Sequence, residues 1–426
     1  MPVPEIAVLT RLLDTAVAAA QPSTCLASAL PAPMPGRTVV VGAGKAAASM
    51  ARTVESTWPG SGGTLEGLVV TRYGFSEPTE RIEIVEASHP VPDDSGLRAA
   101  ERVLNAVSGL TSDDLVLALI SGGGSALLTL PAPGITLADK QAVTDALLRS
   151  GAPIDDINAV RKHLSAIKGG RLAAAAYPAK LVTLAISDVV GDDPATIASG
   201  PTVADPTTRA DAAAVLRRNR IPPLPAVLDH LASPASESPK QGDPGLAAAD
   251  YRIIASGPAA LAAGAEAARL LELEPVILDD AATGEASEVA REHAAVALKV
   301  AAENPAWPIV LLSGGELTVT IEGDGRGGPN SEYLLALALA LDGAENIHAL
   351  ACDTDGIDGS EDNAGAVVTP DTLARARKAG LDPRALLKNN NAYSFFEALG
   401  DLVLTGPTGT NVNDFRALLV GALPPR

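Results

Sequence analysis

Short apolar segments recur along the chain, and most lead into a glycine-rich turn and then an alanine-rich stretch with helical spacing. The segments of the first half are 38–41, 67–71, 115–120 and 181–186, and those of the second half are 251–255, 275–278, 309–312 and 347–351. Continuous apolar runs of this length are typical of strands buried on both faces of a parallel sheet. Strands that alternate with helices form right-handed crossovers. The pattern therefore predicts an α/β fold, with one α/β unit in each half.

The length of the chain indicates more than one domain. Its 426 residues exceed what a single hydrophobic core usually supports. The stretch LASPASESPKQGDPGLAAAD, residues 231–250, concentrates Pro, Ser and Gly without an apolar period. We interpret this stretch as a linker or a long surface loop. The sequence thus predicts two domains, residues 1–245 and residues 246–426.

The excess of acidic over basic residues argues against some classes of binding partner. There are 51 acidic and 32 basic residues, a net charge of −19, which argues against a nucleic-acid or anionic-membrane partner. An anionic substrate would therefore have to meet local basic groups. Cys25 and Cys352 are too few for a disulfide framework, and no window reaches about 18 apolar residues. The beginning of the sequence has no secretory signal pattern, so we expect a cytoplasmic protein.

An acidic loop follows the apolar run 181–186. Asp188, Asp192 and Asp193 lie where the carboxyl end of a buried strand is expected, and catalytic groups collect there in open α/β sheets. Three carboxylates within six residues suit a magnesium or general-base site. The alternative is a solvated acidic turn that caps the next helix.

The first glycine-rich turn, in VVVGAGKAAAS, satisfies GxGxxA and contains Gly42, Gly44 and Lys45. A dinucleotide fingerprint requires an acidic residue about 20 positions later, but the next strand ends in Thr71 and Arg72. NAD is therefore disfavoured, while NADP stays open. We favour the interpretation that the backbone amides of this segment point toward an anion and that Lys45 adds a positive charge. A purely structural strand-to-helix turn is the alternative.

The second glycine-rich turn consists of Ser121, Gly122, Gly123, Gly124 and Ser125 and follows the apolar run DLVLALI. Successive glycines before a hydroxyl at a helix start form an anion nest. No GxxxxGK[ST] occurs, so a P-loop fold is unexpected. The alternative is a tight turn that only requires glycine.

Positive charge gathers in DDINAVRKHLSAIKGGRLA, which contains Arg161, Lys162, His163 and Lys168. One of these cations could steer an acidic substrate, and we take Arg161 as the candidate. A solvated helix face is the alternative, and a structural role suits His163 better. His89, in ASHPVPD, follows a strand and is a further candidate for the cleft.

The second half offers polar groups at other strand ends. Arg326 lies among glycines in GDGRGGPN, where it could contact a transferring phosphoryl group or a carboxylate; a hairpin tip is the alternative. Asp353 and Asp355 open DTDGIDG, and Asn411 lies in GPTGTNVND. DTDGIDG lacks the glutamate that a calcium loop has at its twelfth position, so nucleotide or magnesium contacts are expected there.

Taken together, these motifs resemble the glycerate 2-kinases that carry a MOFRL domain, some of which bear the older name hydroxypyruvate reductase. The resemblance covers nearly the whole chain and rests on eight motifs in order: VVGAGKAA, SGGGSALL, NAVRKHLSAIKGG, ISDVVGDDPATIASGPT, LSGGE, GDGRGGPN, DTDGIDG and GPTGTNVND. It implies a larger Rossmann-like N-terminal domain with a parallel sheet and a smaller α/β C-terminal domain with the MOFRL region. It also implies an active site in the cleft between them, where ATP phosphorylates glycerate.

The resemblance also assigns roles. The family's active-site lysine, aspartate and arginine fall on Lys45, Asp188 and Arg326. Asp188 would orient or deprotonate the 2-hydroxyl of D-glycerate, giving 2-phosphoglycerate, while the two cations hold the carboxylate and the γ-phosphate. The expected substrate and nucleotide contacts are Gly42, Gly44, Ser121, Gly122, Gly123, Gly124, Ser125, His89, Arg161, Glu316 and Asn411, and the expected Mg²⁺ ligands are Asp188, Asp192, Asp353 and Asp355.

Two other functions stay open at this point. An NAD(P)H-dependent hydroxypyruvate reductase is supported by GAGKAA and by the older family name, but the missing acidic ribose partner argues against it. A non-catalytic small-molecule sensor is the third class. The expected partners are glycerate and ATP, and the sequence leaves a homodimer open.

Overall fold

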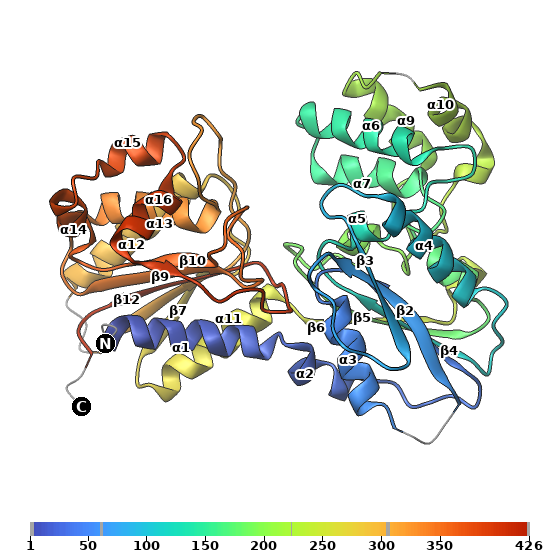
Figure 1. Ribbon diagram of the computed structural model, residues 1–426, viewed down its shortest axis with the longest axis horizontal. Helices are drawn as coiled ribbons and strands as arrows, with labels where there is room; N and C mark the ends of the chain where they lie inside the picture. The colour runs from blue at the N-terminus through green and yellow to red at the C-terminus, as the bar shows by residue number, and fades with distance from the viewer. Residues whose placement is uncertain (1–3, 60–62, 223, 304–306, 424–426) are drawn as a thin grey trace. The chain divides into compact units, whose positions relative to one another are not determined.

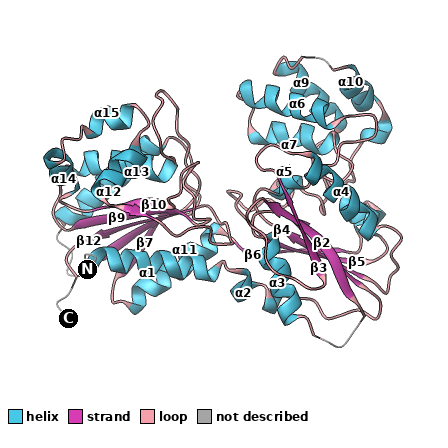
Figure 2. Ribbon diagram, in the orientation of Figure 1, coloured by secondary structure: helices cyan, strands magenta, loops and turns pink. Residues whose placement is uncertain are grey.

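The computed structural model describes residues 4–59, 63–222, 224–303 and 307–423. The chain divides into two units. Residues 22–254 form the first unit, and residues 1–21 together with 255–426 form the second. Figure 2 shows that both units combine helices with a sheet, which confirms the predicted two-domain α/β fold.

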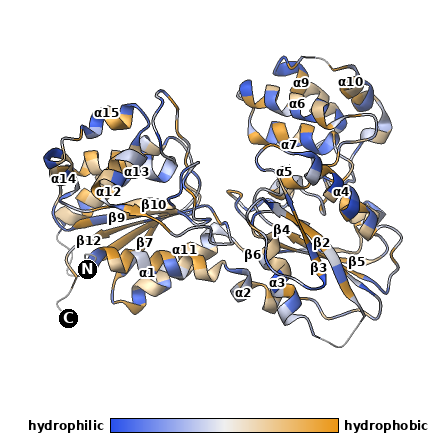
Figure 3. Cartoon of the chain, in the orientation of Figure 1, coloured by the Kyte–Doolittle hydropathy of each residue, from blue (hydrophilic) through white to orange (hydrophobic). Residues whose placement is uncertain are grey.

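The first unit contains a six-stranded sheet with the order β3-β2-β1-β4-β5-β6. Its strands are β1 (Thr38–Ala43), β2 (Leu65–Arg72), β3 (Ile82–Ala87), β4 (Leu115–Ile120), β5 (Lys180–Ile186) and β6 (Ala249–Ala255). The pairings β1–β2, β2–β3, β1–β4 and β4–β5 are parallel. This order is that of doubly wound Rossmann sheets, so the Rossmann-like prediction is confirmed. In Figure 3 the strands are coloured mainly as hydrophobic, as expected for a sheet covered on both faces.

Helices cover both faces of this sheet. α4 (Asp94–Val107) and α8 (Arg171–Ala176) share a hydrophobic core with strand residues such as Val41 and Val70. α3 (Ala47–Thr57) packs on β1, β2 and β4, but none of its residues belongs to that core, so it covers the other face. Asp93 begins α4 by accepting a hydrogen bond from the amide of Gly96 at 2.9 Å.

Four helices of the first unit form a cluster with its own core, which the sequence analysis did not anticipate (Figure 1). They are α6 (Leu137–Arg149), α7 (Ile154–His163), α9 (Arg209–Arg218) and α10 (Pro225–Ala232). α6 begins with a capping box, in which Thr136 accepts from the amide of Asp139 and the Asp139 carboxylate accepts from the amide of Thr136. The short helices α2 (Pro22–Cys25) and α5 (Gly124–Leu127) complete the unit.

The stretch 231–250, interpreted above as a linker or surface loop, belongs to the first unit. Its residues Ser236 and Ser238 are buried, and the Ser238 hydroxyl donates to Asp205 Oδ2 at 2.8 Å. These contacts tie the stretch to the unit that precedes it. β6 follows and is a neighbour of β5, although the sequence pattern had placed this strand at the start of the second series.

The second unit contains a mixed sheet with the order β11-β10-β9-β12-β8-β7. Its strands are β7 (Glu274–Asp279), β8 (Ile309–Ser313), β9 (Ile347–Asp353), β10 (Gly365–Val368), β11 (Leu402–Val403) and β12 (Asp414–Val420). β7 and β8 are parallel, whereas β12 runs antiparallel to both β8 and β9. The sheet of this unit is therefore mixed, because β12 returns between two strands that precede it in sequence.

Helices cover both faces of the mixed sheet as well (Figure 1). On one side are α12 (Ala286–Ala302), α13 (Pro329–Leu341), α14 (Thr372–Lys378), α15 (Pro383–Lys388) and α16 (Ala392–Leu399), and on the other are α1 (Pro4–Ala19) and α11 (Gly257–Leu270). The described part of the chain contains no helix with the length and apolar character of a membrane span.

The N-terminal helix packs on the second unit. α1 buries Leu9 and Leu12 and lies against α11, β9 and β12. Beyond α1, the Thr410 hydroxyl donates to the carbonyl of Ala20 at 2.7 Å, and Gln21 Nε2 donates to the carbonyl of Thr408 at 2.8 Å. The structural division therefore falls after residues 21 and 254, where the sequence analysis placed a single boundary after residue 245.

Candidate functional site

Three predicted catalytic or binding loops leave the same edge of the first sheet. In the first unit the chain adds β2 and β3 on one side of β1 and then β4, β5 and β6 on the other side. The switch point of the sheet therefore lies between β1 and β4. Ala43 of β1 is paired with Ile120 of β4, which is paired with Ala185 of β5. Lys45, Ser121–Ser125 and Asp188 follow these three positions. Ligands of open α/β sheets bind at this switch point.

The glycines of the first turn allow β1 and β4 to approach closely. A Cβ on Gly42 would lie 1.9 Å from the carbonyl oxygen of Leu119, and one on Gly44, whose φ is +145°, would lie 2.1 Å from Ser121 Oγ. Three consecutive amides donate within the unit at 2.8–3.0 Å, from Gly44 to the Val70 carbonyl, from Lys45 to the Gly122 carbonyl and from Ala46 to Ser121 Oγ. These amides are therefore occupied, which differs from the anion-facing arrangement we favoured from the sequence. The half-buried Lys45 side chain is the charged group that this turn supplies.

The second turn brings predicted residues together. A Cβ on Gly123 would lie 3.1 Å from His89 Nε2 and 3.5 Å from Lys45 Cγ, so the three residues are neighbours. Among the described residues, the amides of Gly122 and Gly123 have no hydrogen-bond acceptor. The Ser125 hydroxyl lies 2.9 Å from the hydroxyl of Ser199. This turn, rather than the first, has the open amides of an anion nest.

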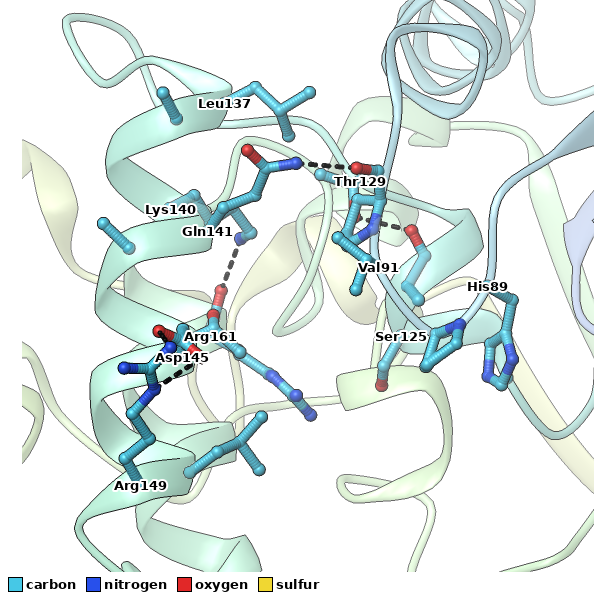
Figure 4. Close-up of a pocket in the computed structure, with 18 residues that line it drawn as sticks. His89, Val91, Ser125, Thr129, Leu137, Lys140, Gln141, Asp145, Arg149 and Arg161 are labelled. Atoms are coloured by element: carbon cyan, nitrogen blue, oxygen red, sulfur yellow. Dashed lines mark hydrogen bonds and ion pairs between the residues drawn. The ribbon is translucent and has the colours of Figure 1, made fainter. Parts of the chain in front are cut away.

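A pocket of about 820 Å³ begins at this turn (Figure 4). It is lined by four of the predicted contacts, His89, Gly123, Ser125 and Arg161, and its remaining walls are largely apolar. Figure 4 shows Arg161 lying between α6 and Ser125. Its volume is in the range of small-molecule sites.

Among the pocket residues that the sequence analysis did not name, Lys140 is a buried cation. It is only 6% exposed, on the face of α6 that also buries Val143 and Leu147. A lysine in register with apolar residues along one helix face was the available signal. On the same helix, Gln141 Nε2 donates to the carbonyl of Pro92 at 2.7 Å and so fixes the loop that carries His89.

The acidic loop after β5 has two parts. Asp188 is half-buried directly after the strand. Asp193 accepts from the amide of Ala195 at 3.1 Å and from the Thr196 hydroxyl at 2.7 Å, so it caps the turn that follows. Asp192 has a positive φ of 54°. The capping alternative therefore describes Asp193, whereas Asp188 lies beside the predicted site.

In the second unit, Arg326 is held in place. Asn391 Oδ1 accepts from its backbone amide at 3.0 Å, and Glu361 Oε2 accepts from its Nε at 2.9 Å. The guanidinium also lies 4.2 Å from the centre of the Tyr393 ring. The glycine-rich loop around Arg326 is further bound by Asn389 and Asn390. The run Asn389–Asn391 was the signal that the sequence analysis did not use.

The acidic residues of DTDGIDG bind backbone amides. Asp353 Oδ1 accepts from the amide of Asp355, and Asp355 Oδ1 accepts from the amide of Ile357, at 2.8 and 2.9 Å. Asp358 is buried and accepts from the amides of Asn330 and Ser331 at the start of α13. Burial raises the pKa of Asp358 to about 6, against the opposing effect of these hydrogen bonds.

Two other predicted contacts lie at the same edge of the second sheet. β8 ends just before the exposed Glu316, and β12 begins just after the buried Asn411. The amide of Asp414 donates to the carbonyl of Gly315 at 3.2 Å, and Asp414 is paired with Asp353 in the sheet register. The structure therefore gathers Glu316, Asn411 and Asp353 within this unit.

The predicted metal ligands form two pairs in different units, Asp188 with Asp192 and Asp353 with Asp355. Within the described ranges, no group of three or more His, Cys, Asp or Glu side chains is placed to hold a metal ion. Protein sites for Mg²⁺ often supply only one or two carboxylates and leave the other positions to phosphates and water. Either carboxylate pair is thus compatible with Mg²⁺ that arrives with a nucleotide.

Comparisons with known proteins cover nearly the whole chain. Residues 8–232 match the family described as a domain of unknown function (DUF4147), and residues 309–414 match the MOFRL family. A protein of Agrobacterium vitis that bears the name hydroxypyruvate reductase is 56% identical, over 97% of this chain and 94% of its own length.

Glycerate kinases match over similar spans. The D-glycerate 2-kinase of Thermotoga maritima is 38% identical, and the match covers 97% of each chain. The crystal structure of a glycerate kinase from Thermotoga maritima superposes with a TM-score of 0.88 and 37% identity, over 97% of this chain and 99% of that one. The chain thus belongs to the family of glycerate kinases that carry a MOFRL domain.

Proposed function

We propose that this protein is a kinase that transfers the γ-phosphoryl group of ATP to the 2-hydroxyl of D-glycerate and releases 2-phosphoglycerate. Its similarity to glycerate kinases supports glycerate phosphorylation. The observation that carries the proposal is the meeting of Lys45, His89 and Gly123 at the switch point, on the strand edge that Asp188 also follows.

The proposed chemistry depends on charge and position. Phosphoryl transfer requires an acceptor hydroxyl in line with the γ-phosphate and neutralisation of the phosphate oxygens. Asp188 orients the 2-hydroxyl or takes its proton. Lys45 and Arg326 bind the glycerate carboxylate and the γ-phosphate. The open amides of Gly122 and Gly123 offer further donors to one of these anionic groups.

Mg²⁺ is part of the proposal. Asp188 with Asp192, or Asp353 with Asp355, would hold it, and when bound it neutralises charge on the nucleotide phosphates. We further propose a cytoplasmic location, because a chain with only two cysteines, Cys25 and the buried Cys352, suits a reducing compartment.

Two observations support the reductase alternative, and two others argue against it. The strand order is that of dinucleotide-binding sheets, and the 56%-identical relative is named a hydroxypyruvate reductase. However, the amides after β1 that would contact a pyrophosphate are occupied by Val70, Gly122 and Ser121. At the end of β2, where a ribose carboxylate is required, Arg72 lies 5.0 Å from the Phe75 ring centre.

The test supplies the purified protein with D-glycerate, ATP and Mg²⁺ and couples product formation to enolase. A parallel reaction follows NADPH oxidation with hydroxypyruvate. Turnover in the enolase assay supports both the kinase and the 2-position. ATP consumption without an enolase signal would indicate the 3-position or another acceptor, and NADPH oxidation alone would replace the kinase with the reductase.

A further inference from the structure

Arg161 is a cation of the pocket that has no counter-ion among the described residues. Its side chain lines the pocket and is half-buried. Among the described residues, its guanidinium forms no hydrogen bond and no ion pair. Burial lowers the pKa of Arg161. A guanidinium has five donors in a planar fork, and leaving them unpaired in a partly buried position is unfavourable.

Two buried lysines increase the positive potential around Arg161. Lys140 lines the same pocket, and its Nζ donates to the carbonyls of Arg161 and Leu164 at 3.1 and 3.3 Å. Lys168 is fully buried, and its Nζ donates to the carbonyl of Leu128 at 2.8 Å. Within the described part of the chain, neither lysine forms an ion pair with a carboxylate. Among the described residues, the two lysines therefore have only carbonyl oxygens as acceptors, and the Arg161 guanidinium has none.

The pKa values of both lysines are shifted in the direction expected for buried cations that lie close together. Burial and the nearby charges of Arg161 and Arg171 lower the pKa of Lys140 to about 7. Burial and the charges of Lys140 and Arg161 lower the pKa of Lys168 well below its ordinary value. The cations repel one another, and a bound anion would offset this repulsion.

Neighbouring cations of the same unit show how the chain treats positive charge elsewhere. Lys162, the next residue after Arg161, is buried and pairs with the buried Asp205 at 2.8 Å. Arg149, which also lines the pocket, is mostly exposed and pairs with Asp145 at 3.0 Å. The missing carboxylate at Arg161 is thus specific to the end of the pocket where Lys140 also lies.

We propose that this end of the pocket is an oxyanion subsite, in which Arg161 binds a carboxylate or phosphate group of the ligand bidentately. Lys140 and Lys168 act as positioning residues that hold the surrounding backbone and raise the local potential. The apolar walls receive the uncharged part of the ligand. The inference deepens the proposed function and rests on it only for the choice of ligands, which are the carboxylate of D-glycerate and the phosphates of the nucleotide.

The experiment measures binding by titration calorimetry with the full chain. D-glycerate carries a carboxylate without phosphate, and ADP carries phosphates without a carboxylate. The variants are Arg161→Met, which removes the fork and the charge, and Arg161→Lys, which keeps only the charge. Arg218→Met is the matched control, because it removes an exposed, ion-paired arginine of the same unit that does not line the pocket. Thermal unfolding of each variant verifies that it is folded.

The expected result is that Arg161→Met weakens binding of one ligand about 10- to 100-fold, with a smaller loss for Arg161→Lys. Arg218→Met changes either affinity less than about 3-fold. A loss confined to D-glycerate identifies the carboxylate as the bound group, and a loss confined to ADP identifies the phosphates. A loss for both ligands at an unchanged unfolding temperature means that they share the subsite.

Other outcomes overturn the inference. They are wild-type protein that binds neither ligand, Arg161→Met that binds both as tightly as wild type, and Arg218→Met that loses as much affinity as Arg161→Met. The proposed kinase is judged separately. Binding that depends on Arg161, without enolase-coupled turnover, would support the subsite and contradict the kinase function. Turnover together with unchanged binding by Arg161→Met would support the kinase function and contradict the subsite.

Discussion

The pocket of the first unit and the strand ends of the second unit both contain several charged side chains. The two regions differ in whether these side chains have partners of opposite charge or backbone amides within the protein. In the first unit, Arg161 lines a pocket without a carboxylate partner among the described residues, and Lys140 and Lys168 donate there only to carbonyls. In the second unit, Asp358 accepts from two amides at the start of α13, and Arg326 is paired with Glu361. The first region contains charge that a ligand can match, whereas much of the charge in the second region already has a partner within the protein.

This difference separates two uses of charged residues in loops. A charge that is paired or bonded to backbone amides fixes the course of the chain. A charge that is partly buried without an opposite charge is costly and indicates a ligand. By this criterion we expect the cations that contact substrate mainly in the first unit. The carboxylates of DTDGIDG shape their own loop in addition to any role toward nucleotide or metal.

The largest expected effect concerns the switch point of the first unit. Lys45→Ala and Asp188→Asn should each lower kcat by about 10²- to 10⁴-fold, because they remove a phosphate or carboxylate contact and the group that orients the hydroxyl. The enolase-coupled assay measures this loss, and an unchanged thermal unfolding midpoint verifies the fold. Near-normal turnover in either variant would end the role given to that residue.

Arg326 tests whether the second unit also contributes to the chemistry. We expect Arg326→Met to lower kcat about 10²-fold if this guanidinium contacts a transferred or bound anion. The matched variant is Glu361→Gln, which weakens the ion pair that holds Arg326 without removing the arginine. It should change kcat less than about 3-fold, because the arginine is half exposed. Equal rates in both variants and wild type would confine the chemistry to residues other than Arg326.

Asp358 tests the structural use of charge in the second unit. Asp358→Ala should lower the free energy of unfolding by about 1–3 kcal/mol, because the amides of Asn330 and Ser331 lose their acceptors. Urea unfolding measures the change. Asp358→Asn retains one side-chain oxygen and should be less destabilising. A variant as stable as wild type would show that the carboxylate does not hold the start of α13.

The sequence predicted the parts of the fold that depend on local pattern. All eight apolar runs form strands, and every residue of β1 and β4 is buried, as expected for strands covered on both faces. β12 was missed since it begins with Asp414 and contains Arg416, which is buried by pairing with Asp414 and the Gly314 carbonyl. Its place between β8 and β9 depends on long-range pairing that no local pattern encodes.

The candidate site divides in the same way. Residue types at strand ends could be identified from the motifs, because glycines and charged groups follow apolar runs. The pocket could not, since His89, Ser125 and Arg161 come from three separate segments that meet only in the folded unit. Lys140 was missed because a lysine on an apolar helix face resembles an ordinary surface residue until the packing around it is known.

The smallest expected effect concerns a matched charge of the first unit, Glu237. Burial alone would raise the pKa of this carboxyl, but hydrogen bonds from Lys240 and His163 lower it to about 2. A folded pKa below the unfolded value of about 4.5 gives stability that is complete above about pH 4.5 and is lost as the pH falls toward 2. Because Glu237 is about one-third exposed, we expect only about 1 kcal/mol from this carboxylate. Urea unfolding at pH 6 and pH 3 should therefore show a smaller acid-induced loss for Glu237→Gln than for wild type. Equal losses in the two proteins would show that the hydrogen-bonded carboxylate contributes nothing to acid sensitivity, and would weaken the contrast between matched and unmatched charges within this unit.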